Sequence, residues 1–227
     1  MNVVTELETS INEFNQKYQE NFAIDTIRIS YSKQYKKVKL DNLGKWKKLN
    51  ANDNRILNKL KKRLTVDEIT SAYQLENYNI YYYNSAIAPK YNQATMVIFG
   101  LKQYHKEAPP QHLIESILNI LVFGTSKVNI NIDICKDFFY KPNIEALNNF
   151  YHLTPFITKN GLITDTRYIN NPEITMIEKV IIYNKQVKNN LSFKVWRAEA
   201  KVLIPNIKLL SLPLYELKTY IFDLLST

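Results

Sequence analysis

The chain has 227 residues, enough for one ample hydrophobic core, and its 4 glycines exclude collagen-like and glycine-rich classes. No run of about 18 apolar residues predicts a membrane-spanning helix, and no basic segment followed by an apolar one opens the chain. We therefore expect a soluble, cytoplasmic protein. The single cysteine, Cys135, excludes an internal disulfide.

The positive charge is concentrated in one segment. Of the 30 basic residues, eleven lie between Lys36 and Arg63, with only two of the 21 acidic residues, so this segment accounts for the whole net charge of +9. Such concentration is the footprint of a polyanion partner, and the segment lacks the broad apolar stripe of a membrane-binding helix. A solvated basic face without a partner is the alternative. The basic residues are Lys36, Lys37, Lys39, Lys45, Lys47, Lys48, Arg55, Lys59, Lys61, Lys62 and Arg63.

Hydrophobic periodicity predicts the elements of the N-terminal part. Residues 3–20 have the spacing of a helix and residues 22–31 alternate like a strand. A loop or short hairpin follows, and then a helix over 53–64 with Ile56, Leu57, Leu60 and Leu64 facing inward. Thr65 has the character of a cap for a second helix that ends near Leu75. These pieces form a basic helical insert over residues 36–76.

The remainder predicts a sheet with helices. Alternation and breaker residues indicate strands over 79–83, 95–104, 129–138, 163–169, 179–185 and 195–204, and helices over 112–123, after Pro142 and from Ser211 onward. The predicted fold class is α+β. We expect one domain over 1–227, in which an antiparallel sheet of five or more strands has helices packed on one face.

Two of these strands set charged groups opposite an apolar face. In NINIDICKDF, Asp133 and Asp137 oppose a row of isoleucines, and in VWRAEAKV, Arg197 and Glu199 share a face. The carboxylates of Asp133, Asp137 and Glu199 are hard oxygen ligands that suit Mg²⁺ or Mn²⁺. The alternative is a surface strand whose carboxylates form ion pairs with Arg197, Lys185 and Lys136.

A tyrosine beside such a site could attack a phosphodiester that Arg197 and Lys185 neutralise. Sixteen tyrosines are present. Tyr168, next to Arg167 and a polar turn, is favoured as the exposed phenol, and Tyr183, on one strand face with Lys185, is the second candidate. Tyr81, Tyr82 and Tyr83 could stack on single-stranded bases, although alternate members of such a strand usually fill the core.

The remaining motifs exclude several kinds of chemistry. The three histidines, His105, His112 and His152, belong to no paired-histidine or HExxH motif, which argues against zinc hydrolysis. The chain also lacks the glycine-rich motifs of nucleotide-driven motors and the GxSxG motif of serine hydrolases.

In their order, these segments resemble the replication initiator proteins of rolling-circle plasmids and filamentous phages. The resemblance runs from about Ile24 to Val202 and rests on four short motifs. These are the strand FAIDTIRISY, the IDIxxDF-like segment 132–138, the YDK-like Tyr183-Asn184-Lys185, and the RxE-like Arg197-Ala198-Glu199. Because the chain has no histidine pair, it is similar to the branch that lacks the paired-histidine metal motif.

This resemblance implies site-specific, metal-dependent nicking and joining of DNA at a replication origin. It makes Asp133, Asp137 and Glu199 the metal ligands and Tyr168 the nucleophile. DNA is the implied partner, as origin duplex, hairpin or single strand, and a homodimer and a host helicase are further candidate partners. Two alternatives stay open: a non-catalytic origin-recognition or copy-control protein, and an assembly protein of a mobile element that binds nucleic acid without specificity.

Overall fold

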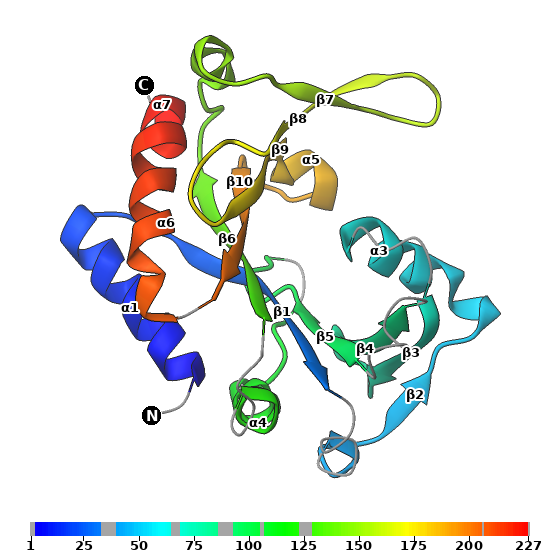
Figure 1. Ribbon diagram of the computed structural model, residues 1–227. Coiled ribbons are helices and arrows are strands. Elements are labelled where there is room, and N and C mark those ends of the chain that lie inside the picture. The colour runs from blue at the N-terminus through cyan, green and yellow to red at the C-terminus, as the bar shows by residue number, and fades with distance from the viewer. Residues whose placement is uncertain are drawn as a thin grey trace. The chain divides into compact units, whose positions relative to one another are not determined.

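The computed structural model describes residues 3–32, 40–64, 69–85, 93–104, 107–122, 129–205 and 207–226 (Figure 1). The chain divides into two compact units. The first unit comprises Met1–Val4, Thr26–Leu101 and Ala108–Ile130, and the second comprises Thr5–Asp25, Lys102–Glu107 and Asn131–Thr227. Each unit is therefore assembled from segments that are distant in the sequence.

Ten antiparallel strands confirm the predicted α+β class. Those of the first unit follow the order β2-β3-β4-β5-β1, and those of the second follow β6-β10-β9-β8-β7. Their bounds are β1 Ala23–Ser32, β2 Trp46–Lys48, β3 Ile69–Leu75, β4 Ile80–Ser85, β5 Gln93–Phe99, β6 Asn129–Phe138, β7 Thr154–Ile157, β8 Ile163–Asn170, β9 Ile177–Asn184 and β10 Trp196–Ile204.

Helices precede, interrupt and follow these strands. The structure contains α1 Val3–Tyr18, the 3-10 turn η2 Ala51–Asp53, α3 Asn54–Leu64, α4 Gln111–Val122, η4 Ile144–Asn149, α5 Lys185–Asn189, η5 Ile207–Leu209, α6 Ser211–Leu217, the π-helical η6 Lys218–Phe222 and α7 Asp223–Ser226. The predicted helix after Pro142 is thus a 3-10 helix. No helix of the described residues has the length and apolar character needed to cross a membrane.

In the first unit, α3 packs on one face of the sheet. Ile56, Leu57 and Leu60 contact a core that includes Tyr81 and Tyr83. This inward face of α3 was predicted from its periodicity, and the side chain of Leu64 lies outside the described residues. Tyr82 projects from the other face and stacks on the Tyr73 ring, with 4.5 Å between centroids. Tyr81 and Tyr83 therefore fill the core.

The predicted second helix of the basic insert is wrong. Residues Ile69–Leu75 form β3, which pairs with β2 on one side and β4 on the other. The residues that predicted a helix start, Thr65, Asp67 and Glu68, lie outside the described residues. Hydrogen bonding on both edges, together with the strand preference of the β-branched and aromatic residues in ITSAYQL, outweighs the cap signal that precedes it. The second of the two helices predicted for the basic insert is therefore replaced by a strand over Ile69–Leu75.

In the second unit, β6 directs alternate side chains to two different environments. Lys136 and Phe138 face the helices: Lys136 Nζ lies 2.7 Å from the Glu20 carboxylate, and the Phe138 ring packs against Phe222. Tyr18 of α1 contacts Tyr215 of α6, and these helices lie side by side in Figure 1. One face of this part of the sheet is therefore covered by helices, as predicted. Lys136 forms its ion pair with Glu20 on this face. It is therefore not the ion-pair partner that was expected for the aspartates of β6.

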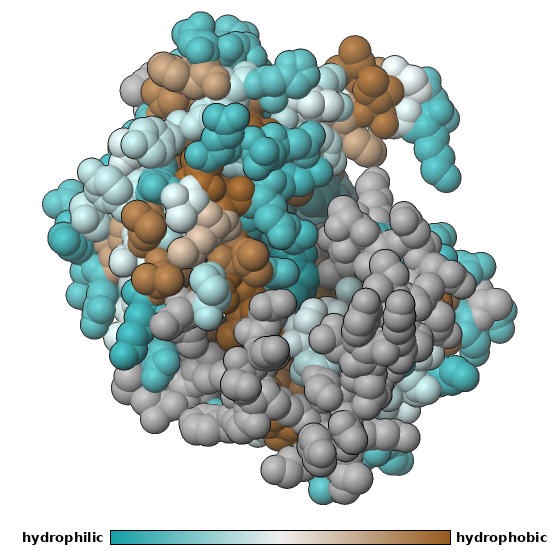
Figure 2. Space-filling view, in the orientation of Figure 1, coloured by the Kyte–Doolittle hydropathy of each residue, from teal (hydrophilic) through white to brown (hydrophobic). Residues whose placement is uncertain are grey.

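The β7–β8 hairpin was not predicted in full, because β7 is only four residues long. Its tip, at Lys159-Asn160-Gly161, is closed by hydrogen bonds from the Gly161 amide to the Thr158 carbonyl and from the Leu162 amide to the Thr158 hydroxyl. Apolar side chains show as brown at this tip in the upper right of Figure 2, and Leu162 is 67% exposed.

Candidate functional site

The register of the second unit places the predicted site residues on one face of the sheet. Arg197 pairs with Tyr183, and Glu199 pairs with Ile181, which in turn pairs with Tyr168 on β8. Directly opposed residues of antiparallel strands project to the same side. Arg197, Glu199, Tyr183 and Tyr168 therefore share the face opposite the helices, on three consecutive strands.

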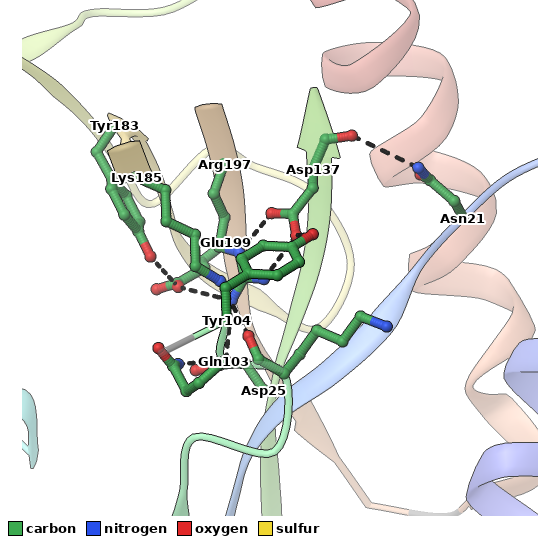
Figure 3. Close-up of polar contacts among 10 residues, drawn as sticks. Asn21, Asp25, Gln103, Tyr104, Asp137, Tyr183, Lys185, Arg197 and Glu199 are labelled. Atoms are coloured by element: carbon green, nitrogen blue, oxygen red, sulfur yellow. Dashed lines mark hydrogen bonds and ion pairs between the residues drawn. The ribbon is translucent and has the colours of Figure 1, made fainter. Parts of the chain in front are cut away.

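Arg197 lies at the centre of this face (Figure 3). Its guanidinium donates to Asp137 from Nε at 2.5 Å and from Nη2 at 2.7 Å, and to Asp25 from Nη1 at 2.9 Å. Glu199 lies 3.7 Å from Nη1. The Arg197 side chain is fully buried, so three carboxylates compensate one buried cation.

Asp25 is the residue of this cluster that the sequence analysis missed. It lies at the N-terminal end of β1, and its side chain accepts hydrogen bonds from both Arg197 and Gln103 Nε2, the latter at 2.8 Å. The signal was present in FAIDTIRISY, because Asp25 occupies the same strand parity as Ile27, Ile29 and Tyr31, which are all buried. A carboxylate at an apolar position predicts a buried partner.

The electrostatics of the cluster follow from its burial and pairing. Burial alone would raise the pKa of Asp137, but the hydrogen bonds and charge of Arg197 outweigh it and hold that pKa below its ordinary value. Burial would lower the pKa of Arg197, but the hydrogen bonds and charge of Asp137 help to raise it above its ordinary value. Cys135 is buried beside the cluster, and this burial raises the pKa of its thiol, so the sulfur stays protonated and unreactive.

Tyr183 is part of the same network. It is 4% exposed and its hydroxyl donates to Glu199 Oε1 at 2.5 Å. Burial and the Glu199 charge both raise the pKa of Tyr183 well above its ordinary value. A buried phenol that is held in its protonated form by a carboxylate is a poor nucleophile, and this environment favours Tyr168 over Tyr183 for that role.

Lys185 and Tyr104 lie beside the cluster. Lys185 is buried and its Nζ donates to the Lys102 carbonyl at 2.9 Å, while also lying 4.7 Å from the centre of the Tyr104 ring. Burial and the Arg197 charge lower the pKa of Lys185. The Tyr104 hydroxyl donates to Asp137 Oδ2 at 2.8 Å, and burial together with this bond raises its pKa to about 12. Tyr104 was not predicted as a site residue, and the sequence around it gives no sign of its hydrogen bond to Asp137.

Tyr168 lies two strands from Glu199 and is half-buried. Because neighbouring strands are about 4.8 Å apart, its Cα is roughly 10 Å from that of Glu199. Lys179 Nζ lies 4.2 Å from the centre of the Tyr168 ring. Burial raises the pKa of Tyr168, whereas burial and the charge of Lys201 lower the pKa of Lys179. Lys179, whose pKa is lowered, thus lies against Tyr168, the candidate nucleophile.

The carboxylates differ in how well they fit a divalent cation. Asp133 and Asp137 are four residues apart on one strand, so their Cα atoms are about 13 Å apart, too far to share one ion easily. Asp25, Asp137 and Glu199 instead surround the Arg197 guanidinium, with Asp25 and Glu199 next to Nη1 and Asp137 next to Nε. Their oxygen atoms have the chemistry that Mg²⁺ and Mn²⁺ prefer. Within the described part of the chain, no group of three or more His, Cys, Asp or Glu side chains is arranged to hold a metal ion.

The basic segment is described in part. Lys47, Lys48 and Arg55 are exposed, and Lys47 Nζ lies 3.3 Å from Asp53. Lys45 is exposed as well, and Lys61 is half-buried. The structure does not describe Lys36, Lys37 and Lys39, nor the side chains of Lys59, Lys62 and Arg63. The described cations belong to the first unit, whereas the Arg197 cluster belongs to the second.

Comparison with known proteins gives one match. No family model matches the sequence, and no curated protein matches it significantly. A solved structure titled as a rolling circle replication initiator protein from Geobacillus stearothermophilus is similar, with 15% identity and a TM-score of 0.45 over 84% of this chain and 77% of that chain. A likeness at this level does not assign the chain to a family.

Proposed function

We propose that this protein is a DNA-binding replication initiator of a plasmid or phage that nicks and rejoins a single strand through Tyr168. The observation that carries the proposal is the shared face of β8, β9 and β10. On this face the half-buried Tyr168 lies on β8, and the buried Arg197 lies with Glu199 on β10, next to Asp137 on the neighbouring strand β6. The resemblance of the motifs to rolling-circle initiators agrees with this arrangement, and the basic segment supplies a surface for phosphates.

The proposed reaction is a transesterification. The phenolic oxygen of Tyr168 forms a bond to phosphorus while the bond from phosphorus to the 3′-oxygen breaks. The phenol loses its proton and the departing oxygen gains one, which leaves a 5′-phosphotyrosine and a free 3′-hydroxyl. Lys179 is the candidate base, because its Nζ lies 4.2 Å from the centre of the Tyr168 ring and its lowered pKa raises the fraction that is neutral and able to accept the phenolic proton. The reverse reaction restores the strand.

Asp137 and Glu199, with Asp25, would hold the proposed Mg²⁺ or Mn²⁺. When bound, such an ion neutralises phosphate charge and polarises the phosphorus centre. Arg197 already contacts these carboxylates, so it must share them with the ion or turn towards the phosphate. Lys185, next to Arg197, adds a second positive charge on this face. Asp133 is the weaker ligand candidate because of its distance along β6.

A second candidate function is a non-catalytic origin-recognition or copy-control protein. The saturation of the carboxylates favours it: Arg197, Tyr183, Tyr104 and Gln103 together occupy Asp25, Asp137 and Glu199. A buried and fully paired ionic cluster is also what a purely structural network looks like. A non-catalytic protein of this kind would bind DNA tightly and form no covalent product with DNA in the presence of any metal ion.

The test is incubation with single-stranded DNA from the protein's own replicon, with Mn²⁺ or with a chelator, followed by a denaturing gel. We expect a metal-dependent adduct that resists SDS and that Tyr168→Phe abolishes while DNA binding is unchanged. Tyr140→Phe is the matched control, because it removes the hydroxyl of an exposed tyrosine of the same unit and should leave the adduct. The absence of an adduct from the wild-type protein, together with salt-sensitive binding, would establish the non-catalytic alternative.

A further inference from the structure

Two exposed aromatic rings lie beside the Arg197 cluster. The Tyr104 and Phe193 rings meet edge to face, with 5.3 Å between centroids and an angle of 89°. Tyr104 is 39% exposed and Phe193 is 40% exposed, although large aromatic side chains are usually buried when the fold can cover them. Tyr104 also reaches the site itself, because its hydroxyl binds Asp137 in Figure 3. The pair therefore connects the buried cluster to the surface.

The geometry of the pair leaves ring surface available. Lys185 Nζ lies against the Tyr104 ring, 4.7 Å from its centre, but in an edge-to-face contact the Phe193 ring keeps at least one face clear of Tyr104. The contact also fixes the two rings relative to each other, so little side-chain entropy remains to be lost when a flat group stacks on them.

The surroundings of the pair are positively charged. The two segments that carry it, residues 101–104 and 185–196, contain the lysines at 102, 185, 188 and 194 and no acidic residue. Lys102, Lys188 and Lys194 are exposed. Aromatic rings interleaved with lysines are the combination by which proteins bind single-stranded nucleic acids, since rings stack on bases and cations meet phosphates.

We infer that Tyr104 and Phe193 form a base-stacking site for single-stranded DNA, which holds a nucleotide beside the phosphate that Arg197 and Lys185 face. The inference rests on the proposed function for its substrate class and adds a positioning role for two residues. Lys194 follows Phe193 directly in the chain and Lys188 precedes it by five residues, so we assign the phosphate of the stacked nucleotide to these two lysines. The Tyr104–Asp137 hydrogen bond couples the ring to the cluster.

The test compares two fluorescently labelled single-stranded probes of equal length, oligo(dT) and an oligomer with abasic sites throughout, bound in the presence of chelator. Phe193→Ala should weaken binding of oligo(dT) by about 5- to 150-fold, the range for loss of one stacked base, and leave binding of the abasic probe unchanged. The salt dependence of oligo(dT) binding should not change, because stacking releases no counterions. Phe193→Trp should retain affinity.

Phe150→Ala is the matched control, since it removes another exposed phenylalanine of the same unit, 66% exposed. It should alter neither affinity. Replacement of both Lys188 and Lys194 by Gln should instead weaken binding of both probes and make the log–log salt slope shallower by about 1.4. If the first substitution prevents folding, Phe193→Leu keeps the apolar volume and should still lose affinity for oligo(dT) alone.

Equal affinity of Phe193→Ala and wild type for oligo(dT), or an equal loss on both probes, would overturn the inference. These results are independent of the proposed reaction. Binding is measured in chelator, where no strand transfer occurs, so a wild-type protein that forms no adduct can still show the difference between the two probes. Conversely, an adduct that depends on Tyr168 with no such difference would refute the stacking site alone.

Discussion

Arg197 and Asp137 form a two-pronged ion pair inside the second unit, with Nε and Nη2 of the guanidinium on separate carboxylate oxygens at 2.5 and 2.7 Å. The side chains are 0% and 8% exposed. Parallel bonds of this kind fix both orientation and distance, which a lysine could not do. The pair therefore determines where the guanidinium points relative to β9 and β10.

The first prediction concerns the stability that depends on Arg197. Arg197→Met leaves Asp25, Asp137 and Glu199 without their cation, and uncompensated buried charge costs about 3–5 kcal/mol. We expect a decrease of this size in the free energy of unfolding, measured by urea denaturation at neutral pH.

Lys201→Met is the control for that substitution. Lys201 lies on the same strand and pairs with Glu178 at 2.6 Å, but the two side chains are 23% and 44% exposed. Solvent screening limits the loss to about 1 kcal/mol or less. Equal losses for the two variants would show that burial does not set the energetics of the Arg197 cluster.

The second prediction is a pH dependence that passes through Asp137. Its pKa is lower in the folded protein than in the unfolded chain, so its ionised form stabilises the fold. This contribution is complete above the ordinary aspartate pKa of about 3.9 and is lost as the pH falls through the lower folded value. Asp137→Asn should be less stable than wild type at pH 7, and the difference should narrow below about pH 4. A constant difference from pH 7 to pH 2.5 would contradict the prediction.

The long strands β6 and β10 of the second unit were predictable because each has one apolar side. In β6 and β10 the side chains alternate between the helix-covered face and the Arg197 face, and a period of two is the strongest local signal of a strand. β3 was mispredicted because its local sequence follows a helix-capping pattern, and only pairing with β2 and β4 decides in favour of a strand. β7 and β2 are too short to give a periodic signal.

The sequence predicts which site residues share a face of their own strand, but not which strands lie next to each other. Alternation placed Asp137 with Asp133, and Arg197 with Glu199, on common strand faces. Which strands lie side by side depends on the order β6-β10-β9-β8, which no local pattern encodes. For this reason the contacts of Arg197 with Asp25, and of Tyr104 with Asp137, appear only in three dimensions.

The third prediction contrasts two glycines with positive φ. A Cβ on Gly44, at φ +151°, would meet Glu76 Oε1 at 2.8 Å and Leu75 Cδ1 at 3.1 Å, whereas a Cβ on Gly161, at φ +78°, would meet no atom within 4 Å. Gly161→Ala therefore costs only the backbone strain of the left-handed region, about 1 kcal/mol. Gly44→Ala adds a steric clash and should cost more. Thermal unfolding of both variants measures the two losses of stability. A larger loss for Gly161→Ala than for Gly44→Ala would contradict the prediction.

The last prediction concerns the basic segment and salt. If eight to ten of its eleven cations contact phosphates, the log–log slope of duplex DNA affinity against salt concentration is about −7 to −9. Replacement of Lys45, Lys47 and Lys48 by Gln should weaken binding to unrelated sequences equally and make the slope shallower by about 3, because phosphate contacts carry no sequence information. The matched control is the replacement of Lys141, Lys159 and Lys208 by Gln. These lysines are exposed and belong to the second unit, so their replacement should leave the salt slope unchanged. A wild-type slope shallower than about −3 would remove the basic segment from the DNA interface and leave the charge of residues 36–63 as a solvated surface.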